Sequence, residues 1–211
     1  MSRAALPAGA FAMLALATPP LVGCAPVPPA PARSSSRSPA PEADAALAEF
    51  EVVLAANPSA TAALEQWCAR RGIAPEAEVR ATMITAGADR DEAAALASAA
   101  RLALGLGADE PLGFRHVRLD CGGVVLSEAY NWYAPARLTP DMTRALATSR
   151  IPFGKVAAPL RYRRELIESR RGSAGECPPG VILSHRALLR LPDGHPLSLL
   201  VECYTGANLG G

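Results

Sequence analysis

The sequence predicts an α+β domain built around a mainly antiparallel sheet. In the first half of the chain, apolar residues such as Leu47, Phe50 and Leu54 recur at helical spacing. The second half instead alternates apolar and polar residues with the two-residue period of strands. The turn sequences Gly122-Gly123 and Pro192-Asp193-Gly194 separate neighbouring strand-like runs, as hairpins require.

Start and stop residues place the elements along the chain. Ser59 or Thr61 begins the second helix, and Gly72 ends it. Thr139 supplies a capping hydroxyl for a later helix, with proline at its first position. Residues 160–168 are predicted as a strand, although their many charges leave a helix open. The expected elements are helices at 45–57 and 59–72, a strand at 79–84, a helix from Asp89 or Asp91 to 104, strands at 115–120 and 124–133, a helix from 140 that ends in a turn at 151–154, and strands at 160–168, 181–191 and 197–204.

The first 24 residues resemble the signal peptide of a bacterial lipoprotein. An apolar run follows Arg3, and Leu21-Val22-Gly23-Cys24 places small residues before a cysteine. The resemblance implies that Cys24 carries fatty acids such as palmitate, which anchor the chain to a membrane. Residues 25–44 are predicted to be a disordered Pro/Ala/Ser tether, and residues 45–211 the folded domain. We therefore expect a protein of the cell envelope, on the outer membrane or facing the periplasm; without lipid attachment it would stay in the cytoplasm.

Composition argues against several classes of partner and site. The chain has 21 basic and 20 acidic side chains, and this near balance argues against a nucleic-acid surface. Its histidines are not spaced as metal ligands, so no metal site is predicted. Once Cys24 is acylated, four cysteines remain, and export would allow them to form disulfides in any of three full pairings. These are Cys68, Cys121, Cys177 and Cys203.

Two charges stand in strands that otherwise carry buried apolar side chains. Arg115 shares its strand face with Val117 and Leu119, so it points toward the core. Glu202 is the one charge in the apolar strand 197–204. An unpaired buried charge is costly, so each needs a partner in the protein or in a ligand. The sequence leaves two explanations open: Arg115 and Glu202 form a structural ion pair, or they belong to a functional site.

Five segments have the order and spacing of a known family. They are Arg115-His116-Val117-Arg118-Leu119, Leu126-Ser127-Glu128-Ala129-Tyr130-Asn131-Trp132-Tyr133-Ala134-Pro135, Ile151-Pro152-Phe153-Gly154, Arg164-Glu165-Leu166-Ile167-Glu168 and Leu199-Leu200-Val201-Glu202. They resemble the chorismate pyruvate-lyase family, and the similarity spans residues 58–209. The resemblance implies a six-stranded antiparallel sheet covered by helices, with an enclosed pocket. It also implies the cofactor-independent conversion of chorismate to 4-hydroxybenzoate and pyruvate, a reaction of ubiquinone biosynthesis.

The resemblance assigns three residues to the pocket. The family's carboxylate-binding arginine falls on Arg115, its pocket glutamate on Glu202, and a pocket-lining leucine on Phe153. Elimination of the enolpyruvyl ether makes the ring of chorismate aromatic, so a protein needs mainly to orient the substrate, exclude water and stabilise developing charge. Arg115 would hold the ring carboxylate, and Glu202 would act as a hydrogen-bonding partner or a general acid–base.

Two pocket positions depart from the family pattern. The lid methionine falls on Ala60, and a second pocket arginine falls on Asn131. Chorismate carries two carboxylates, so the loss of one arginine puts the substrate in question unless Arg164, Arg118 or His185 compensates. We expect a monomer that needs no cofactor and whose partner is a small aromatic carboxylate, either chorismate or 4-hydroxybenzoate.

The expected location and the expected chemistry disagree, because chorismate is a cytoplasmic metabolite. Three functions remain open. The chain is a working chorismate lyase, a lipoprotein that binds an aromatic acid without catalysis, or a structural envelope lipoprotein in which Arg115 and Glu202 pair. The sequence favours the lyase, because the motifs and both key residues match the family.

Overall fold

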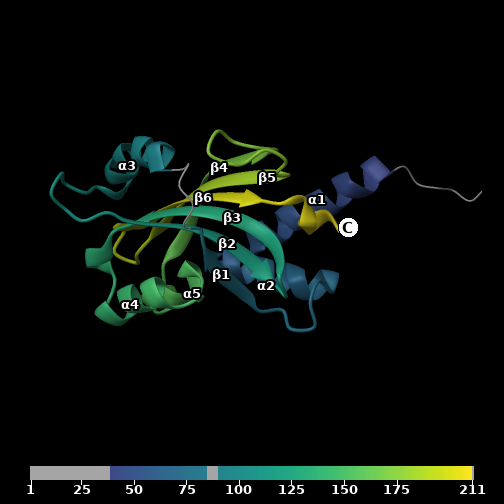
Figure 1. The fold of residues 1–211 in the computed structure, drawn as a ribbon, viewed down its shortest axis with the longest axis horizontal. Helices are drawn as coiled ribbons and strands as arrows, with labels where there is room; N and C mark the ends of the chain where they lie inside the picture. Colours follow the sequence, from purple (N-terminus) through teal and green to yellow (C-terminus); the bar gives the residue numbers. More distant parts are fainter. Residues whose placement is uncertain (1–38, 85–89, 211) are drawn as a thin grey trace, which may run out of the picture. The chain divides into compact units, whose positions relative to one another are not determined.

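A single antiparallel sheet organises the part of the chain that the structure describes. The structure is a computed structural model, and it describes residues 39–84 and 90–210. Six strands within these ranges form the sheet in the order β1-β2-β3-β6-β5-β4 (Figure 1). The strands are β1 Val79–Met83, β2 Gly113–Cys121, β3 Val124–Tyr133, β4 Arg163–Arg171, β5 Leu183–Arg190 and β6 Pro196–Tyr204. The helices are α1 Pro39–Ala56, α2 Ala60–Arg71, α3 Arg90–Leu104, α4 Pro140–Thr148 and α5 Phe153–Val156, with short 3-10 helices η2 Pro135–Arg137, η3 Ala158–Leu160 and η4 Gly206–Leu209. The predicted α+β class and antiparallel sheet are confirmed.

Helix ends lie where capping residues predict them. Ser59 caps α2, because its hydroxyl accepts a hydrogen bond from the backbone N–H of Ala62 at 3.1 Å. Gly72 ends the same helix with φ +61°, a left-handed conformation that glycine adopts at little cost. Thr139 caps α4 by accepting from the N–H of Met142 at 3.2 Å. Each cap depends on residues within one turn, so the local sequence is sufficient to predict it.

Several boundaries differ from the prediction, including the strand predicted at 160–168, which spans Arg163–Arg171. α1 begins at Pro39, so residues 39–44 of the predicted tether are helical. Proline is compatible with the first turn of a helix, because the N–H it lacks would have no intrahelical partner there. Residues 151–154, predicted as a turn, include the start of α5 at Phe153.

Several predictions fall outside the described residues. The predicted signal peptide, Cys24 and residues 25–38 of the tether all lie there. The predicted start of the third helix adjoins residues 85–89, which are also outside, and α3 is described from Arg90 onward. In the ranges 39–84 and 90–210, no helix has both the length and the apolar character needed to cross a membrane.

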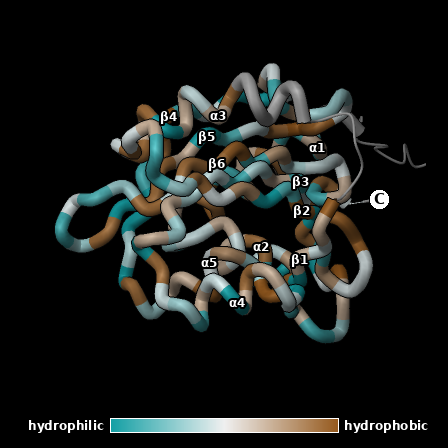
Figure 2. Tube along the Cα trace, turned by 60° about the vertical axis from the view of Figure 1, so that its left-hand side comes forward, coloured by the Kyte–Doolittle hydropathy of each residue, from teal (hydrophilic) through white to brown (hydrophobic). Residues whose placement is uncertain are grey.

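Helices cover both faces of the sheet (Figures 1 and 2). α1 and α2, and separately α4 and α5, pack on the face that carries Leu119 and Leu200. α3 packs on the opposite face, where Leu104 joins Trp132 and Leu199 in one apolar cluster. β6 lies inside the sheet, and its residues 197–204 are buried on both faces, as its apolar sequence predicts. Glu202 therefore lies in a strand that is buried on both faces, and Arg115 is itself only 3% exposed.

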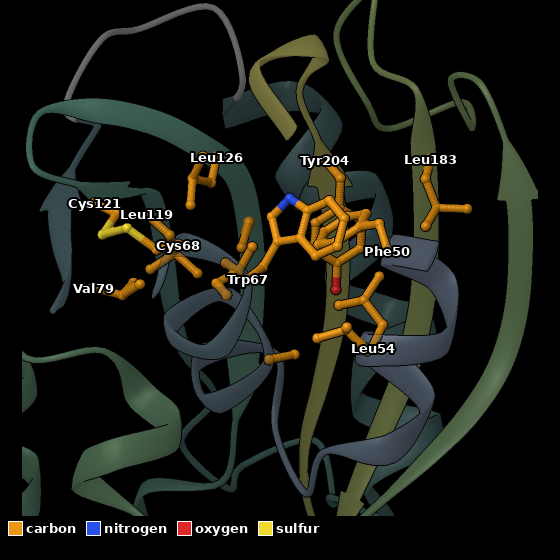
Figure 3. Close-up of a cluster of buried hydrophobic side chains, with 14 of the residues drawn as sticks. Phe50, Leu54, Trp67, Cys68, Val79, Leu119, Cys121, Leu126, Leu183 and Tyr204 are labelled. Carbon is orange, nitrogen blue, oxygen red and sulfur yellow. A yellow bond between two sulfur atoms is a disulfide. The ribbon is translucent and has the colours of Figure 1, made fainter. Parts of the chain in front are cut away.

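A cluster of large side chains joins α1 and α2 to the sheet (Figure 3). The ring of Phe50 lies 5.1 Å from that of Trp67 and 5.2 Å from that of Tyr204. The indole N–H of Trp67 donates to the carbonyl oxygen of Asn208 at 3.0 Å. This bond satisfies a donor that burial would otherwise leave without a partner, and it ties η4 to α2.

Among the described residues, two disulfides select one of the three pairings that the sequence left open. Cys68 of α2 is bonded to Cys121 at the end of β2, as Figure 3 shows. Cys177, in the loop before β5, is bonded to Cys203 of β6. The first disulfide lies on the face covered by α1 and α2, and the second on the face covered by α3. The first disulfide therefore ties a covering helix to the sheet, and the second ties the loop between β4 and β5 to β6.

Candidate functional site

A cavity of about 50 Å³ lies between the sheet and the first turns of α2 and α5. Strands β2, β3 and β6 form its floor, β4 and β5 contribute to one side, and the two helix starts lie opposite. Most of the wall is apolar, and its polar atoms belong to a few side chains. The lining residues are Ser59, Ala60, Thr61, Arg115, Val117, Leu119, Ala129, Asn131, Pro152, Phe153, Gly154, Tyr162, Arg164, Leu189, Leu200 and Glu202.

The six binding residues predicted from the sequence all line this one cavity. They are Ala60, Arg115, Asn131, Phe153, Arg164 and Glu202. Each comes from a different element, so the fold brings together positions that are distant along the chain. Their roles in binding or catalysis stay predictions. Arg118, which the sequence also offered as a compensating cation, is exposed on the opposite face of β2. Its Nε lies 3.5 Å from Glu128 Oε2.

Arg115 is buried, and two of its guanidinium nitrogens have no hydrogen-bond partner among the residues that the structure describes. Its residue is 3% exposed, and it faces the cavity from β2. Within the described part of the chain, its Nε and Nη2 atoms have no hydrogen-bond partner. Burial lowers the pKa of this guanidinium, because the charged form is removed from water, and the nearby Tyr133 opposes that effect. Arg115 therefore offers two donors and a charge to whatever enters the cavity.

Glu202 pairs with Arg164 and not with Arg115, so the structural ion pair suggested for Arg115 and Glu202 is wrong. Arg164 Nη2 donates to Glu202 Oε2, and the hydroxyl of Tyr204 donates to the same oxygen at 2.9 Å. The sheet order explains this choice: β5 lies between β6 and β4, so Arg164 of β4 reaches across β5 to the carboxylate. Burial disfavours the charge on Arg164, but Glu202 outweighs this effect and raises its pKa.

His185 completes this group without adding a charge. Its Nδ1 lies 3.1 Å from Arg164 Nη2 and 4.0 Å from Glu202 Oε2. A guanidinium nitrogen only donates, so Nδ1 must accept, and the ring is neutral with its proton on Nε2. Burial lowers the pKa of His185, which also favours the neutral ring. Tyr204 was not among the residues predicted for the site, although its position two residues after Glu202 in a strand places both on one face.

Asn131 lies directly opposite Arg115 in the pairing of β2 with β3. Its side-chain amide is hydrogen-bonded to the hydroxyl of Ser198, which also lies 3.0 Å from the carbonyl oxygen of Trp132. These contacts fix the amide at the cavity wall. Asn131 therefore provides a neutral polar group beside the guanidinium.

Four residues separate the cavity from a hollow of about 340 Å³ at the surface, because they line both. They are Ser59, Thr61, Gly154 and Tyr162. The hydroxyl of Tyr162 donates to the carbonyl oxygen of Gly154 at 3.1 Å. A Cβ on Gly154 would lie 3.1 Å from both Thr61 Oγ1 and the Tyr162 hydroxyl, so glycine allows this close packing. These four residues are thus a wall one side chain deep in the lining of both spaces.

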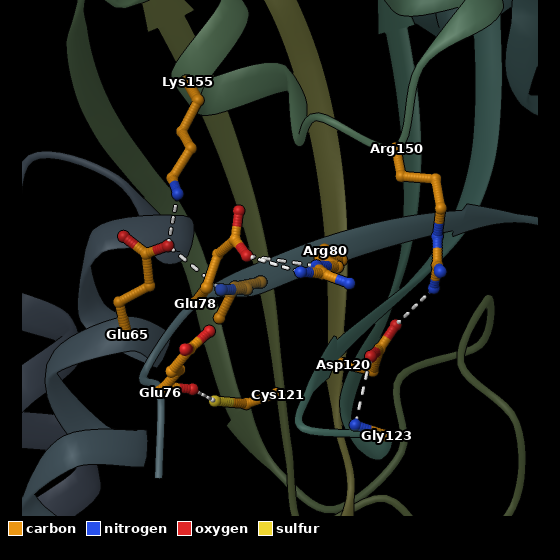
Figure 4. A network of polar contacts seen from close by, with 10 residues as sticks. Glu65, Glu76, Glu78, Arg80, Asp120, Cys121, Gly123, Arg150 and Lys155 are labelled. Atoms are coloured by element: carbon orange, nitrogen blue, oxygen red, sulfur yellow. Dashed lines mark hydrogen bonds and ion pairs between the residues drawn. The ribbon is translucent and has the colours of Figure 1, made fainter. Parts of the chain in front are cut away.

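One ion pair and one hydrogen bond link the helices of this wall to each other and to β1 (Figure 4). Lys155 Nζ of α5 lies 2.5 Å from Glu65 Oε1 of α2. The same carboxylate oxygen accepts from the N–H of Val79 in β1 at 3.0 Å. Glu65 therefore joins the three elements, and it fixes the position of both helix starts relative to the sheet.

The comparisons with known proteins identify one relative over most of the chain. The chain is 36% identical over 182 residues to the uncharacterized protein y4mC from Sinorhizobium fredii, covering 78% of this chain and 75% of that protein. No protein-family model matches the chain.

Solved structures share part of the backbone arrangement. PhnF from Mycobacterium smegmatis matches with a TM-score of 0.47 at 12% identity, over 71% of this chain and 64% of that one. The possible transcriptional regulator YydK from Bacillus subtilis matches with a TM-score of 0.42 at 15% identity, over 62% and 60%. The ligand-binding domain of a putative GntR-family transcriptional regulator from Bordetella bronchiseptica gives 0.41 at 16% identity, over 61% and 85%. This chain thus spans less than two thirds of PhnF and YydK, and likenesses this partial carry no functional argument.

Proposed function

This chain belongs to the same family as the uncharacterized protein y4mC of Sinorhizobium fredii, and we propose that it binds a small aromatic carboxylic acid in the cavity beside Arg115. The observation that carries the proposal is the buried guanidinium, whose Nε and Nη2 lack a partner among the described residues. A carboxylate accepts two parallel hydrogen bonds from a guanidinium and compensates its charge. The apolar side chains of Val117, Leu119 and Leu200 would surround the body of the acid.

Binding of a ring requires the cavity to enlarge. Its volume of about 50 Å³ is roughly one third of the ~150 Å³ of an engineered cavity that holds benzene. The wall of Ser59, Thr61, Gly154 and Tyr162 is a suitable place for enlargement, because the same residues line the outer hollow of about 340 Å³. We therefore expect the acid to enter there, with the Tyr162 to Gly154 hydrogen bond breaking as the wall moves.

Calorimetry with benzoate on the full chain tests the proposal. Wild-type protein should bind, and Arg115→Gln should bind at least about 100-fold more weakly, because a charge-assisted pair contributes roughly 3 kcal/mol. Arg118→Gln is the matched control: it removes an arginine from the same strand, at an exposed position of the opposite face, and should leave affinity unchanged. If benzoate does not bind, or if Arg115→Gln binds as tightly as wild type, the proposal is wrong.

A second candidate function is the chorismate pyruvate-lyase reaction. One observation favours it: the residues that the resemblance assigns to the lyase pocket line a single cavity. In this mechanism Arg115 would hold the ring carboxylate while the ring becomes aromatic. Glu202 would position groups rather than exchange protons, because Arg164 and Tyr204 engage its Oε2. Incubating the full chain with chorismate and measuring 4-hydroxybenzoate, with Arg115→Gln as the blank, decides between lyase and binding protein.

We also propose that the chain is exported and anchored through a lipid on Cys24. The two disulfides support this location, because such bonds persist in oxidising compartments and are rare in the cytosol. Labelling cells with radioactive palmitate should mark the wild-type chain and not Cys24→Ser. Label retained by the variant would rule out Cys24 as the acylation site.

A further inference from the structure

The fixed charges at the cavity sum to a single positive charge. Among the lining residues that the structure describes, the opposite charges of Arg164 and Glu202 sum to zero, and the positive charge of Arg115 remains. His185 behind the pair is neutral, because its Nδ1 accepts from Arg164. Burial raises the pKa of Tyr162, so this phenol also stays neutral near pH 7.

Asn131 adds polarity to the site but no charge. It faces Arg115 across the β2–β3 pairing, and Ser198 holds its amide. An amide is neutral whichever of its two ends faces a ligand, so this position does not attract a second anion as a cation would. The remaining wall beside Arg115 is formed largely by aliphatic side chains such as Val117 and Leu200.

We propose that the cavity selects monocarboxylates over dicarboxylates, a refinement that rests on the proposed carboxylate-binding function. A second carboxylate on the ligand would lose its hydration and meet an aliphatic wall, the negatively charged Glu202 or uncharged hydroxyl groups such as those of Ser59 and Thr61. None of these groups supplies a positive charge. Arg164 does not compensate this second carboxylate, because the guanidinium of Arg164 already pairs with Glu202. The favoured ligand class is therefore a small acid with one carboxylate and an otherwise uncharged body, such as a benzoate, and chorismate with its two carboxylates is disfavoured.

Two acids of nearly identical shape separate charge from size. Terephthalate and 4-nitrobenzoate carry a planar carboxylate or a planar nitro group at the same ring position, and only the first has a second charge. In calorimetry with the full chain, we expect 4-nitrobenzoate to bind at least about 10-fold more tightly than terephthalate, since one unpaired buried charge costs more than 1.4 kcal/mol. If the two acids bind equally, or equally fail to bind, the inference is overturned. Absence of binding by benzoate itself would refute the carboxylate site, which is a different outcome.

A pair of variants tests the source of the selectivity. Glu202→Gln removes the negative charge and releases the charge of Arg164, so the preference for 4-nitrobenzoate should shrink by about 10-fold or reverse. Tyr204→Phe removes a hydrogen bond to the same carboxylate oxygen without changing any charge, and the preference should persist. A Glu202→Gln protein that folds and keeps the wild-type preference would contradict the charge argument.

Discussion

Replacing Arg115 with methionine should stabilise the protein while removing its ligand binding. Methionine keeps an unbranched apolar stem of similar length, so the packing beside Val117 changes little. What the substitution removes is a buried guanidinium whose Nε and Nη2 have no partner within residues 39–84 and 90–210. Removing one partner of a buried ion pair is strongly destabilising, but Arg115 forms no ion pair within the described part of the chain.

The expected gain follows from the number of unpaired donors. One unsatisfied buried donor costs about 1–3 kcal/mol. The cavity of about 50 Å³ has room for a few waters, since each needs roughly 10–15 Å³, and these would hydrate part of the guanidinium. We therefore expect Arg115→Met to raise the free energy of unfolding by about 1–2 kcal/mol, which corresponds to about 2–4 °C in Tm per kcal/mol for a chain of this size.

Arg164→Met provides the contrast within the same cavity. That substitution leaves Glu202 buried without its cation and should lower the free energy of unfolding by about 3–5 kcal/mol. Urea denaturation of the ligand-free full chains, followed by tryptophan fluorescence, measures both variants against wild type. If Arg115→Met is less stable than wild type by more than about 1 kcal/mol, Arg115 has a partner in the folded protein and the reasoning fails.

Three further outcomes follow from the structure. Replacing Cys68 and Cys121 together by serine should cost about 4 kcal/mol in urea denaturation, because the disulfide closes a 53-residue loop; a loss under 1 kcal/mol would contradict this. Burial lowers the pKa of His185 from 6.5, so the unfolded chain binds more protons below pH 6.5 and stability should fall as pH decreases there. His185→Gln should flatten this dependence, and an unchanged slope would exclude the residue. Tyr162→Phe removes the hydrogen bond to Gly154, so stopped-flow mixing should show faster entry and release of benzoate, while unaltered rates would place the entrance elsewhere.

The local features of this fold can be predicted from short stretches of sequence. Ser59 and Thr139 cap helices through bonds to residues three positions later, so the information lies within one turn. The burial of Arg115 and Glu202 follows from two-residue alternation and from an apolar strand, and both are buried. The six predicted binding residues that line the cavity were identified by resemblance to a family, and periodicity alone would not have grouped them.

The partner of Glu202 could not be predicted in this way, because it depends on the order of strands in the sheet. The correct partner, Arg164, lies in β4, whose charges fit a helix as well as a strand. β4 is an edge strand with nearly all of its residues exposed, so it lacks the alternation that identifies a half-buried strand. The disulfide between Cys68 and Cys121 poses the same difficulty, since pairing is a question of proximity in space.

The uncompensated guanidinium of Arg115 also has an evolutionary consequence. A residue that weakens the empty protein is retained only while natural selection rewards what it captures. In any lineage that abandons the ligand, mutation to an uncharged side chain becomes advantageous, and the arginine should disappear quickly. Homologues that keep arginine at this position can therefore be recognised as those that still use their ligand.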